Sequence, residues 1–174
     1  MRARRCTIDS SCIIALDHLE LVPKLSPLFS EVLVPKAVRK ELFKRRATKD
    51  RLPSLFRNYA FIQRCDDYEK GAVDILFAER VRGGTKDKGE AEAVVQASQF
   101  GAWVIVDDRW GQKLAAQSAL EAHGTMWLLE QFHQLGFLSS PALPDCFSSL
   151  RARGLRLPWK IVNQLLSEIG QLPL

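Results

Sequence analysis

The feature that most constrains the fold of this chain is a continuous apolar run, Ala102-Trp103-Val104-Ile105-Val106, followed at once by two aspartates. An uninterrupted apolar strand is typical of a parallel sheet with both faces covered. Two shorter strand signals precede it: Cys6-Thr7-Ile8, which ends at Asp9, and Glu31-Val32-Leu33-Val34. Apolar residues at helical spacing follow each of them. Strands that alternate with helices predict an α/β fold with a parallel sheet.

Capping residues suggest where two of the helices begin and end. Ser10 and Ser11 are candidates for the N-cap of the first helix. Asp87 is the candidate N-cap of a later helix over 89–99, which Gly101 would end.

The remaining segments carry weaker signals. Residues 44–67 form a basic, proline-containing connection that the pattern does not assign, and a short strand is expected before Gly124. Apolar periodicity predicts further helices near 72–81, 110–118, 126–135, 140–152 and 158–169.

Composition narrows the class of protein. The chain has 174 residues, 47% of them hydrophobic, which suits one globular domain over 1–174. No apolar run approaches the ~20 residues that a membrane-spanning helix needs, and the basic start is a poor secretory signal. We therefore expect a cytoplasmic protein with no membrane partner. The four scattered cysteines lack metal-ligand spacing, which predicts reduced, mostly buried thiols.

Two aspartates follow directly after predicted strands. The carboxyl ends of parallel strands meet at one edge of a sheet, where open α/β sheets bind their ligands. Asp9 and Asp107 would therefore share that edge, with Asp108 beside the second. The alternative is that each aspartate only caps the helix that follows it.

Two glutamates border apolar helical faces. Glu41 adjoins Ala37, Val38 and Leu42, and its alternative role is an ion pair with Lys44 or Arg45. Glu90 shares a face with small apolar residues, where an unpartnered carboxylate would be costly. Glu92 points about 200° away from Glu90 on the same helix, so we expect it to be solvated.

Convergence of Asp9, Glu41, Glu90 and Asp107 would require a cation, because four close carboxylates repel one another. Oxygen ligands select Mg²⁺ or Mn²⁺. One or two such ions can activate a water and stabilise the leaving oxygen of a phosphodiester. This set of residues therefore predicts a metal-dependent nuclease.

Other catalytic classes fit less well. The sequence has neither the GxxxxGK[ST] nor the GxGxxG pattern of nucleotide-binding loops, and no GxSxG nucleophile elbow. None of its three histidines has a nucleophile or carboxylate at a recognisable spacing.

Short motifs in a fixed order resemble the PIN-domain ribonucleases, and more narrowly the VapC-like toxins of toxin–antitoxin pairs. The matching motifs are Ile8-Asp9-Ser10-Ser11, Val34-Pro35-Lys36-Ala37-Val38 leading to Glu41-Leu42, Gly89-Glu90-Ala91-Glu92-Ala93, Val104-Ile105-Val106-Asp107-Asp108 and Gly124-Thr125. The order and spacing agree over about 1–137, and the later segments are similar to an uncharacterised prokaryotic PIN subfamily.

The resemblance implies a three-layer, Rossmann-like sheet of about four or five parallel strands. It implies a core over about 5–137 with a C-terminal helical extension over about 138–170. It also implies a Mg²⁺ or Mn²⁺ site and hydrolysis of single-stranded RNA, with Asp9, Glu41, Glu90 and Asp107 as the four acids in order.

The last two acids depart from the usual family pattern. Glu90 stands where most members have aspartate. The final motif often reads Thr-x-Asp, whereas here Val106 takes the threonine position and the aspartate is doubled. We favour Asp107 as the fourth acid because it is nearer the end of the strand, with Asp108 as the alternative.

Basic residues crowd around Glu41, although the chain as a whole has only 25 Lys+Arg against 20 Asp+Glu. They suggest a track for phosphates, with a solvated helix face or an antitoxin-covered surface as the alternative. Ser11 and Trp110 are further candidates, Trp110 either stacking on a base or packing at a helix entry. The predicted nucleic-acid-binding residues are Lys44, Arg45, Arg46, Lys49, Arg51, Ser11 and Trp110.

The leading hypothesis is therefore an endoribonuclease toxin with RNA as substrate and an antitoxin protein as partner. Family members commonly dimerise, so a homodimer is a further expectation. Two alternatives stay open: a PIN-like module that binds nucleic acid or protein without catalysis, and a housekeeping RNA-processing nuclease.

Overall fold

The computed structural model describes residues 4–44, 52–81 and 88–174, and the chain divides into two compact units, 1–123 and 124–174. The expectation of one domain over the whole chain stays a prediction. Within the described residues, no helix is long and apolar enough to cross a membrane. Of the four cysteines, Cys6 and Cys12 are buried and Cys65 and Cys146 are half-buried.

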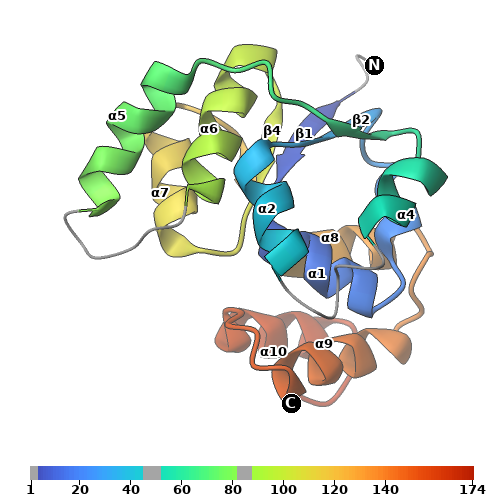
Figure 1. Ribbon diagram of the computed structural model, residues 1–174. Coiled ribbons are helices and arrows are strands. Elements are labelled where there is room, and N and C mark those ends of the chain that lie inside the picture. Colours follow the sequence, from blue (N-terminus) through green and yellow to red (C-terminus); the bar gives the residue numbers. More distant parts are fainter. Residues whose placement is uncertain (1–3, 45–51, 82–87) are drawn as a thin grey trace. The chain divides into compact units, whose positions relative to one another are not determined.

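The first unit is built on a five-stranded parallel sheet (Figure 1). Its strands lie in the order β3-β2-β1-β4-β5. They are β1 (Arg5–Ile8), β2 (Glu31–Val34), β3 (Ile62–Arg64), β4 (Trp103–Ile105) and β5 (Ala122–His123). This confirms the expected α/β fold and parallel sheet.

The strand order creates a switch point between β1 and β4. From β1 the chain builds outward to β2 and β3, and then returns to the other side of β1 to add β4 and β5. Ile8 of β1 is in register with Ile105 of β4. The crevice at the carboxyl ends of two such strands is where parallel α/β sheets bind ligands.

The helices of the first unit connect these strands. α6 is the central one: it packs against β1 and β4, and it also contacts α2, α5 and α7. Figure 1 shows α5, α6 and α7 side by side. The helices are α1 (Ser10–His18), α2 (Lys36–Lys44), α4 (Leu52–Asn58), α5 (Lys70–Val81), α6 (Gly89–Phe100) and α7 (Arg109–Gln117), with a 3₁₀ turn at Val22–Leu25.

Small residues allow α6 to lie close to the sheet. Thr7 of β1 donates a hydrogen bond from its hydroxyl to the Ala93 carbonyl of α6 over 3.0 Å. Ala97 packs with Val104 and Leu114 in one buried cluster. The position of α6 relative to β1 is therefore set by both a hydrogen bond and apolar packing.

Some of the expected helix ends were wrong. Asp9, not Ser10 or Ser11, is the N-cap of α1. The N-cap of α6 is Lys88, without a side-chain capping bond, and Asp87 lies outside the described residues. Gly101 does end α6, in the left-handed conformation with φ of 60°.

The second unit is helical. Its helices are α8 (Thr125–Gln134), α9 (Ala142–Ala152) and α10 (Trp159–Glu168), which confirms the three helical segments expected there. The last residue of the chain contacts α10: the side-chain oxygen of Asn163 accepts from the Leu174 N–H over 2.9 Å.

Candidate active site

Asp9 lies at the switch point of the sheet and is almost fully buried, with 5% of its surface exposed. Its backbone N–H donates to the carbonyl of Ile105 over 2.9 Å, which joins the end of β1 to the end of β4. Its Oδ2 accepts from the N–H and the hydroxyl of Ser11, at 3.1 and 2.6 Å. Asp9 therefore caps α1 and also places a carboxylate at the ligand-binding edge.

Glu41 reaches the same place from α2. Its Oε2 accepts a hydrogen bond from the hydroxyl of Ser10 over 2.6 Å. Ser10 is itself buried, and it directly follows the cap of α1. The contact therefore holds the carboxylate of α2 against the start of α1.

Gly89, the first residue of α6, marks where the two carboxylates meet. A Cβ atom built on Gly89 would lie 2.6 Å from Oε1 of Glu41 and 3.4 Å from Oδ1 of Asp9. The oxygens of both side chains therefore border the same small space. The absence of a side chain at Gly89 leaves that space open.

Glu90 follows immediately and is 8% exposed. Its Cβ and Cγ pack near Gly111 of α7, where an added Cβ would lie 3.3 and 3.2 Å from them. The prediction that the face of Glu90 is buried and apolar is therefore confirmed. Its role as the third acid stays a prediction.

The two aspartates after β4 have different surroundings. Asp108 is exposed and caps α7, accepting from the Trp110 N–H over 2.8 Å. Asp107 is half-buried and lies between Val106 and this cap. The capping alternative was stated for Asp9 and Asp107: Asp9 does cap its helix, whereas α7 is capped by Asp108 and not by Asp107. Asp107 remains the predicted site residue.

The paired carboxylates of Asp9 and Glu41 suit a hard divalent cation. Within the described ranges, no three His, Cys, Asp or Glu side chains are grouped closely enough to hold a metal ion. Mg²⁺, however, is commonly bound through one or two protein carboxylates, with waters and substrate phosphates as the other ligands. The two carboxylates beside Gly89 fit that mode of binding. The four-acid site stays a prediction.

The predicted nucleic-acid-binding residues are only partly described. Arg45, Arg46, Lys49 and Arg51 lie outside the described residues. Ser11 is bonded to Asp9, and Trp110 packs beside buried residues of α6 and α7. Lys44 is exposed at the end of α2.

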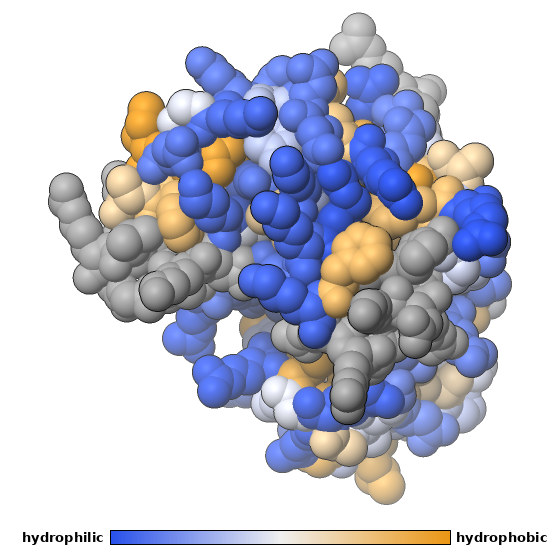
Figure 2. All heavy atoms as spheres, in the orientation of Figure 1, coloured by the Kyte–Doolittle hydropathy of each residue, from blue (hydrophilic) through white to orange (hydrophobic). Residues whose placement is uncertain are grey.

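Lys36, Lys40 and Lys44 form an exposed stripe on α2. They stand four residues apart, so they share one side of the helix that carries Glu41. Figure 2 shows a hydrophilic surface around α2. This stripe places positive charge on the same helix as a candidate metal ligand.

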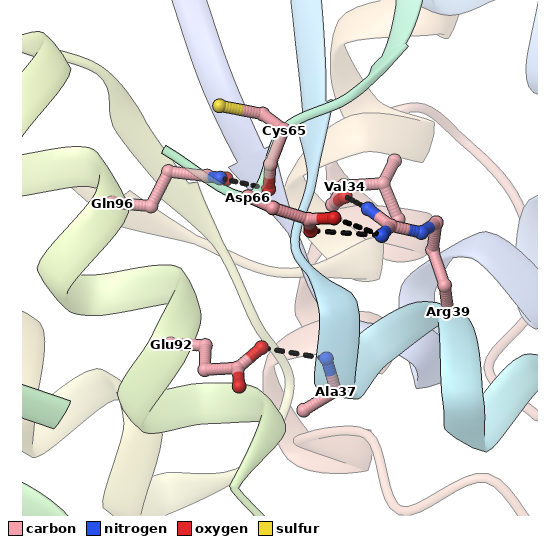
Figure 3. A network of polar contacts seen from close by, with 7 residues as sticks. All are labelled: Val34, Ala37, Arg39, Cys65, Asp66, Glu92 and Gln96. Atoms are coloured by element: carbon pink, nitrogen blue, oxygen red, sulfur yellow. Dashed lines mark hydrogen bonds and ion pairs between the residues drawn. The ribbon is translucent and has the colours of Figure 1, made fainter. Parts of the chain in front are cut away.

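Glu92 was expected to be solvated, and this was wrong. It is half-buried, and its Oε2 accepts from the Ala37 N–H of α2 over 2.6 Å (Figure 3). The helical wheel of α6 could not show this contact, because the partner lies 55 positions earlier in the chain. A proline just before α2 was the one available signal, since Pro35 has no side-chain acceptor for the first N–H groups of that helix.

A cavity of about 750 Å³ lies between α5 and α6. Tyr68, Ala72, Leu76 and Val95 are among its lining residues, which include none of the four predicted acids. The candidate site is therefore the carboxylate edge of the sheet and not this cavity.

Replacing Ser10 with alanine is expected to weaken Mn²⁺ binding at the site by about 10- to 100-fold, which is the usual effect of losing an outer partner if Glu41 is a metal ligand. The change removes the hydroxyl that donates to Glu41. The measurement is the Mn²⁺ dissociation constant. Ser26→Ala is the control, because Ser26 is exposed and its hydroxyl donates to the Pro23 carbonyl, away from the carboxylates. Equal Mn²⁺ dissociation constants in Ser10→Ala and the wild type would show that this hydrogen bond does not position Glu41 for a cation.

Comparisons with known proteins identify the family. A chain of the crystal structure of VapBC2 from Rickettsia felis, bound to a DNA fragment from their promoter, superposes with a TM-score of 0.49 at 11% identity, over 69% of this chain and 98% of that chain. No curated protein sequence matches. The family model DUF3368, described as a PIN domain, matches residues 5–171 and so extends through both units. The chain therefore belongs to the PIN-domain family.

Proposed function

We propose that this protein is an endoribonuclease that hydrolyses single-stranded RNA with Mg²⁺ or Mn²⁺, and that it is the toxin of a toxin–antitoxin pair. The observation that carries the proposal is the meeting of Asp9 and Glu41 at Gly89, at the switch point of a PIN-domain sheet. The toxin role and the antitoxin partner follow from the resemblance of the ordered motifs to VapC-like proteins.

Asp9 and Glu41 would hold the cation, with Glu90 and Asp107 as the further acids. When bound, the cation supplies a Lewis acid for the phosphate and lowers the pKa of a coordinated water. The two serines that follow Asp9 orient the carboxylates through hydrogen bonds. Ser11 donates to Asp9, and Ser10 donates to Glu41. Each carboxylate is thereby held in one orientation before substrate arrives, which lowers the entropic cost of assembling the site.

The lysines of α2 would bind the RNA backbone. Lys36, Lys40 and Lys44 are exposed on the helix that holds Glu41. Contacts between lysine side chains and phosphates carry no base information, so they provide affinity and position. Binding of this kind weakens as the salt concentration rises.

The test is cleavage of a panel of single-stranded RNAs by the purified protein with Mn²⁺, with Mg²⁺ and with EDTA. Calorimetric titration of Mn²⁺ accompanies it. The proposal expects cleavage that depends on the cation, and Mn²⁺ binding without RNA. RNA binding that is unchanged by EDTA, with neither cleavage nor Mn²⁺ binding, would instead favour a non-catalytic module. Growth arrest on expression, relieved by the product of an adjacent gene, separates a toxin from a housekeeping nuclease.

A further inference from the structure

The N-terminus of α2 lacks a capping side chain of its own. The Arg39 N–H donates to the carbonyl of Pro35 over 3.1 Å, so Pro35 stands where an N-cap residue would be. The first N–H groups of a helix need acceptors from outside the helix, and the ring of proline offers none. The acceptors for α2 therefore come from other elements or from water.

Two side chains from elsewhere in the first unit supply them. The carboxylate of Glu92 on α6 accepts from the Ala37 N–H over 2.6 Å. The hydroxyl oxygen of Tyr68 accepts from the backbone N–H of Lys36, and its O–H donates to the carboxylate of Glu92. Burial, together with the Glu92 carboxylate, raises the pKa of Tyr68, so this hydroxyl stays protonated and can donate. Glu92 and Tyr68 thus form a cap built from outside the helix.

A second set of contacts fastens the same region, as Figure 3 shows. Arg39 donates to the carbonyl of Val34 over 2.8 Å and to both oxygens of Asp66, at 2.7 and 2.8 Å. Gln96 of α6 donates to the Cys65 carbonyl over 2.9 Å. The segment after β3 is thereby joined both to α2 and to α6, and the hydrogen bond of Glu92 joins these two helices directly.

The link lies one turn away from the candidate metal ligands. Along α6, Glu92 contacts Ala37 and Gly89 borders Glu41, so the two helices run antiparallel at this contact. The two contact points lie about 4.5 Å apart along α6 and about 6 Å apart along α2, at 1.5 Å per residue. A shift of α2 at Ala37 would therefore move Glu41 relative to Asp9.

We propose that Glu92 is a positioning residue for Glu41: by holding the N-terminus of α2 on α6, it keeps the two carboxylates together at Gly89. This inference rests on the proposed function, because it assigns Glu92 a task in the same site. Glu92 need not touch the cation or the RNA for this task. Its negative charge at the positive end of α2 strengthens the link.

The experiment compares Glu92→Ala, Glu92→Gln and the wild type. Alanine removes the acceptor, so Mn²⁺ affinity and kcat are expected to fall by about 10- to 100-fold. KM should change less than kcat, because the variant keeps the lysine side chains that are proposed to bind the RNA backbone. Glutamine keeps a neutral acceptor and should restore most of the loss. Hydrogen exchange over 36–44 should be faster in the alanine variant than in the wild type.

Glu31→Ala is the matched control, because it removes a carboxylate that forms an ion pair with Arg5 at the start of β2. Its kcat should stay near that of the wild type. The proposal is overturned if Glu92→Ala keeps the wild-type kcat and Mn²⁺ affinity, if it loses no more than Glu31→Ala, or if glutamine restores nothing. A wild-type chain that neither binds Mn²⁺ nor cleaves RNA refutes the proposed function instead, and hydrogen exchange over 36–44 then decides whether Glu92 holds α2.

Discussion

Replacing Asp9 with asparagine is expected to lower cation-dependent RNA hydrolysis by more than about 100-fold, beyond the usual effect of losing an outer partner of a metal ligand. The substitution removes the negative charge from one of the two carboxylates that meet at Gly89. An amide oxygen is a weaker ligand for a hard cation than a carboxylate. Calorimetry should therefore show weaker Mn²⁺ binding, with the loss of activity appearing in kcat.

The fold should survive this change, because asparagine and aspartate are about equally good N-cap residues. The asparagine side chain would still offer an oxygen to the N–H of Ser11, which keeps the start of α1 intact. The midpoint of thermal unfolding should thus stay close to that of the wild type. Asp145→Asn, an exposed site in the first turn of α9, is the control. An Asp9→Asn variant that keeps both activity and Mn²⁺ affinity would refute the proposed mechanism.

The sheet could be predicted from the sequence wherever a strand is buried on both faces. β1, β2 and β4 have apolar or β-branched runs, and each was recognised near its true position. β3 was missed because it is an edge strand of three residues, of which Gln63 and Arg64 are exposed. One buried residue, Ile62, is too little for a period-two pattern to emerge.

The candidate site could be predicted only in part, for a different reason. Asp9 was placed from its position after a strand, and Glu41 from the face of its own helix. Both predictions depend on local sequence alone. Glu92 was misjudged because its partner, the N–H of Ala37, belongs to a helix that only the tertiary fold brings near. The space at Gly89 likewise depends on three separate segments and has no local signal.

The second large effect is expected at that glycine. Gly89→Ala would place a Cβ 2.6 Å from Oε1 of Glu41, so the carboxylate would have to move by about 0.8 Å to reach ordinary contact at 3.4 Å. Displacements near 1 Å in a catalytic arrangement can cost about 100-fold in rate. We therefore expect kcat to fall by about 10- to 100-fold, with a matching loss of Mn²⁺ affinity.

The free energy of unfolding of Gly89→Ala should be equal to that of the wild type or slightly higher. The atom that the new methyl group meets is the far end of a flexible side chain, which can move without disturbing the backbone. Alanine is also favoured over glycine within helices, by up to about 1 kcal/mol. Gly71→Ala is the matched control, because Gly71 is likewise near the start of a helix, α5, and a Cβ there meets no described residue within 4 Å. That variant should keep full activity.

A double-mutant cycle tests whether Gly89 acts through Glu41. If the methyl group harms the site only by displacing this carboxylate, adding Gly89→Ala to a Glu41→Gln variant should lower kcat little further, because the affected ligand is already impaired. Residues in contact are expected to show such non-additive effects, whereas independent sites add. Additive losses would mean that the methyl group acts on another group, for instance on Asp9 Oδ1 at 3.4 Å. The loss of activity in Gly89→Ala would then not result from displacement of Glu41.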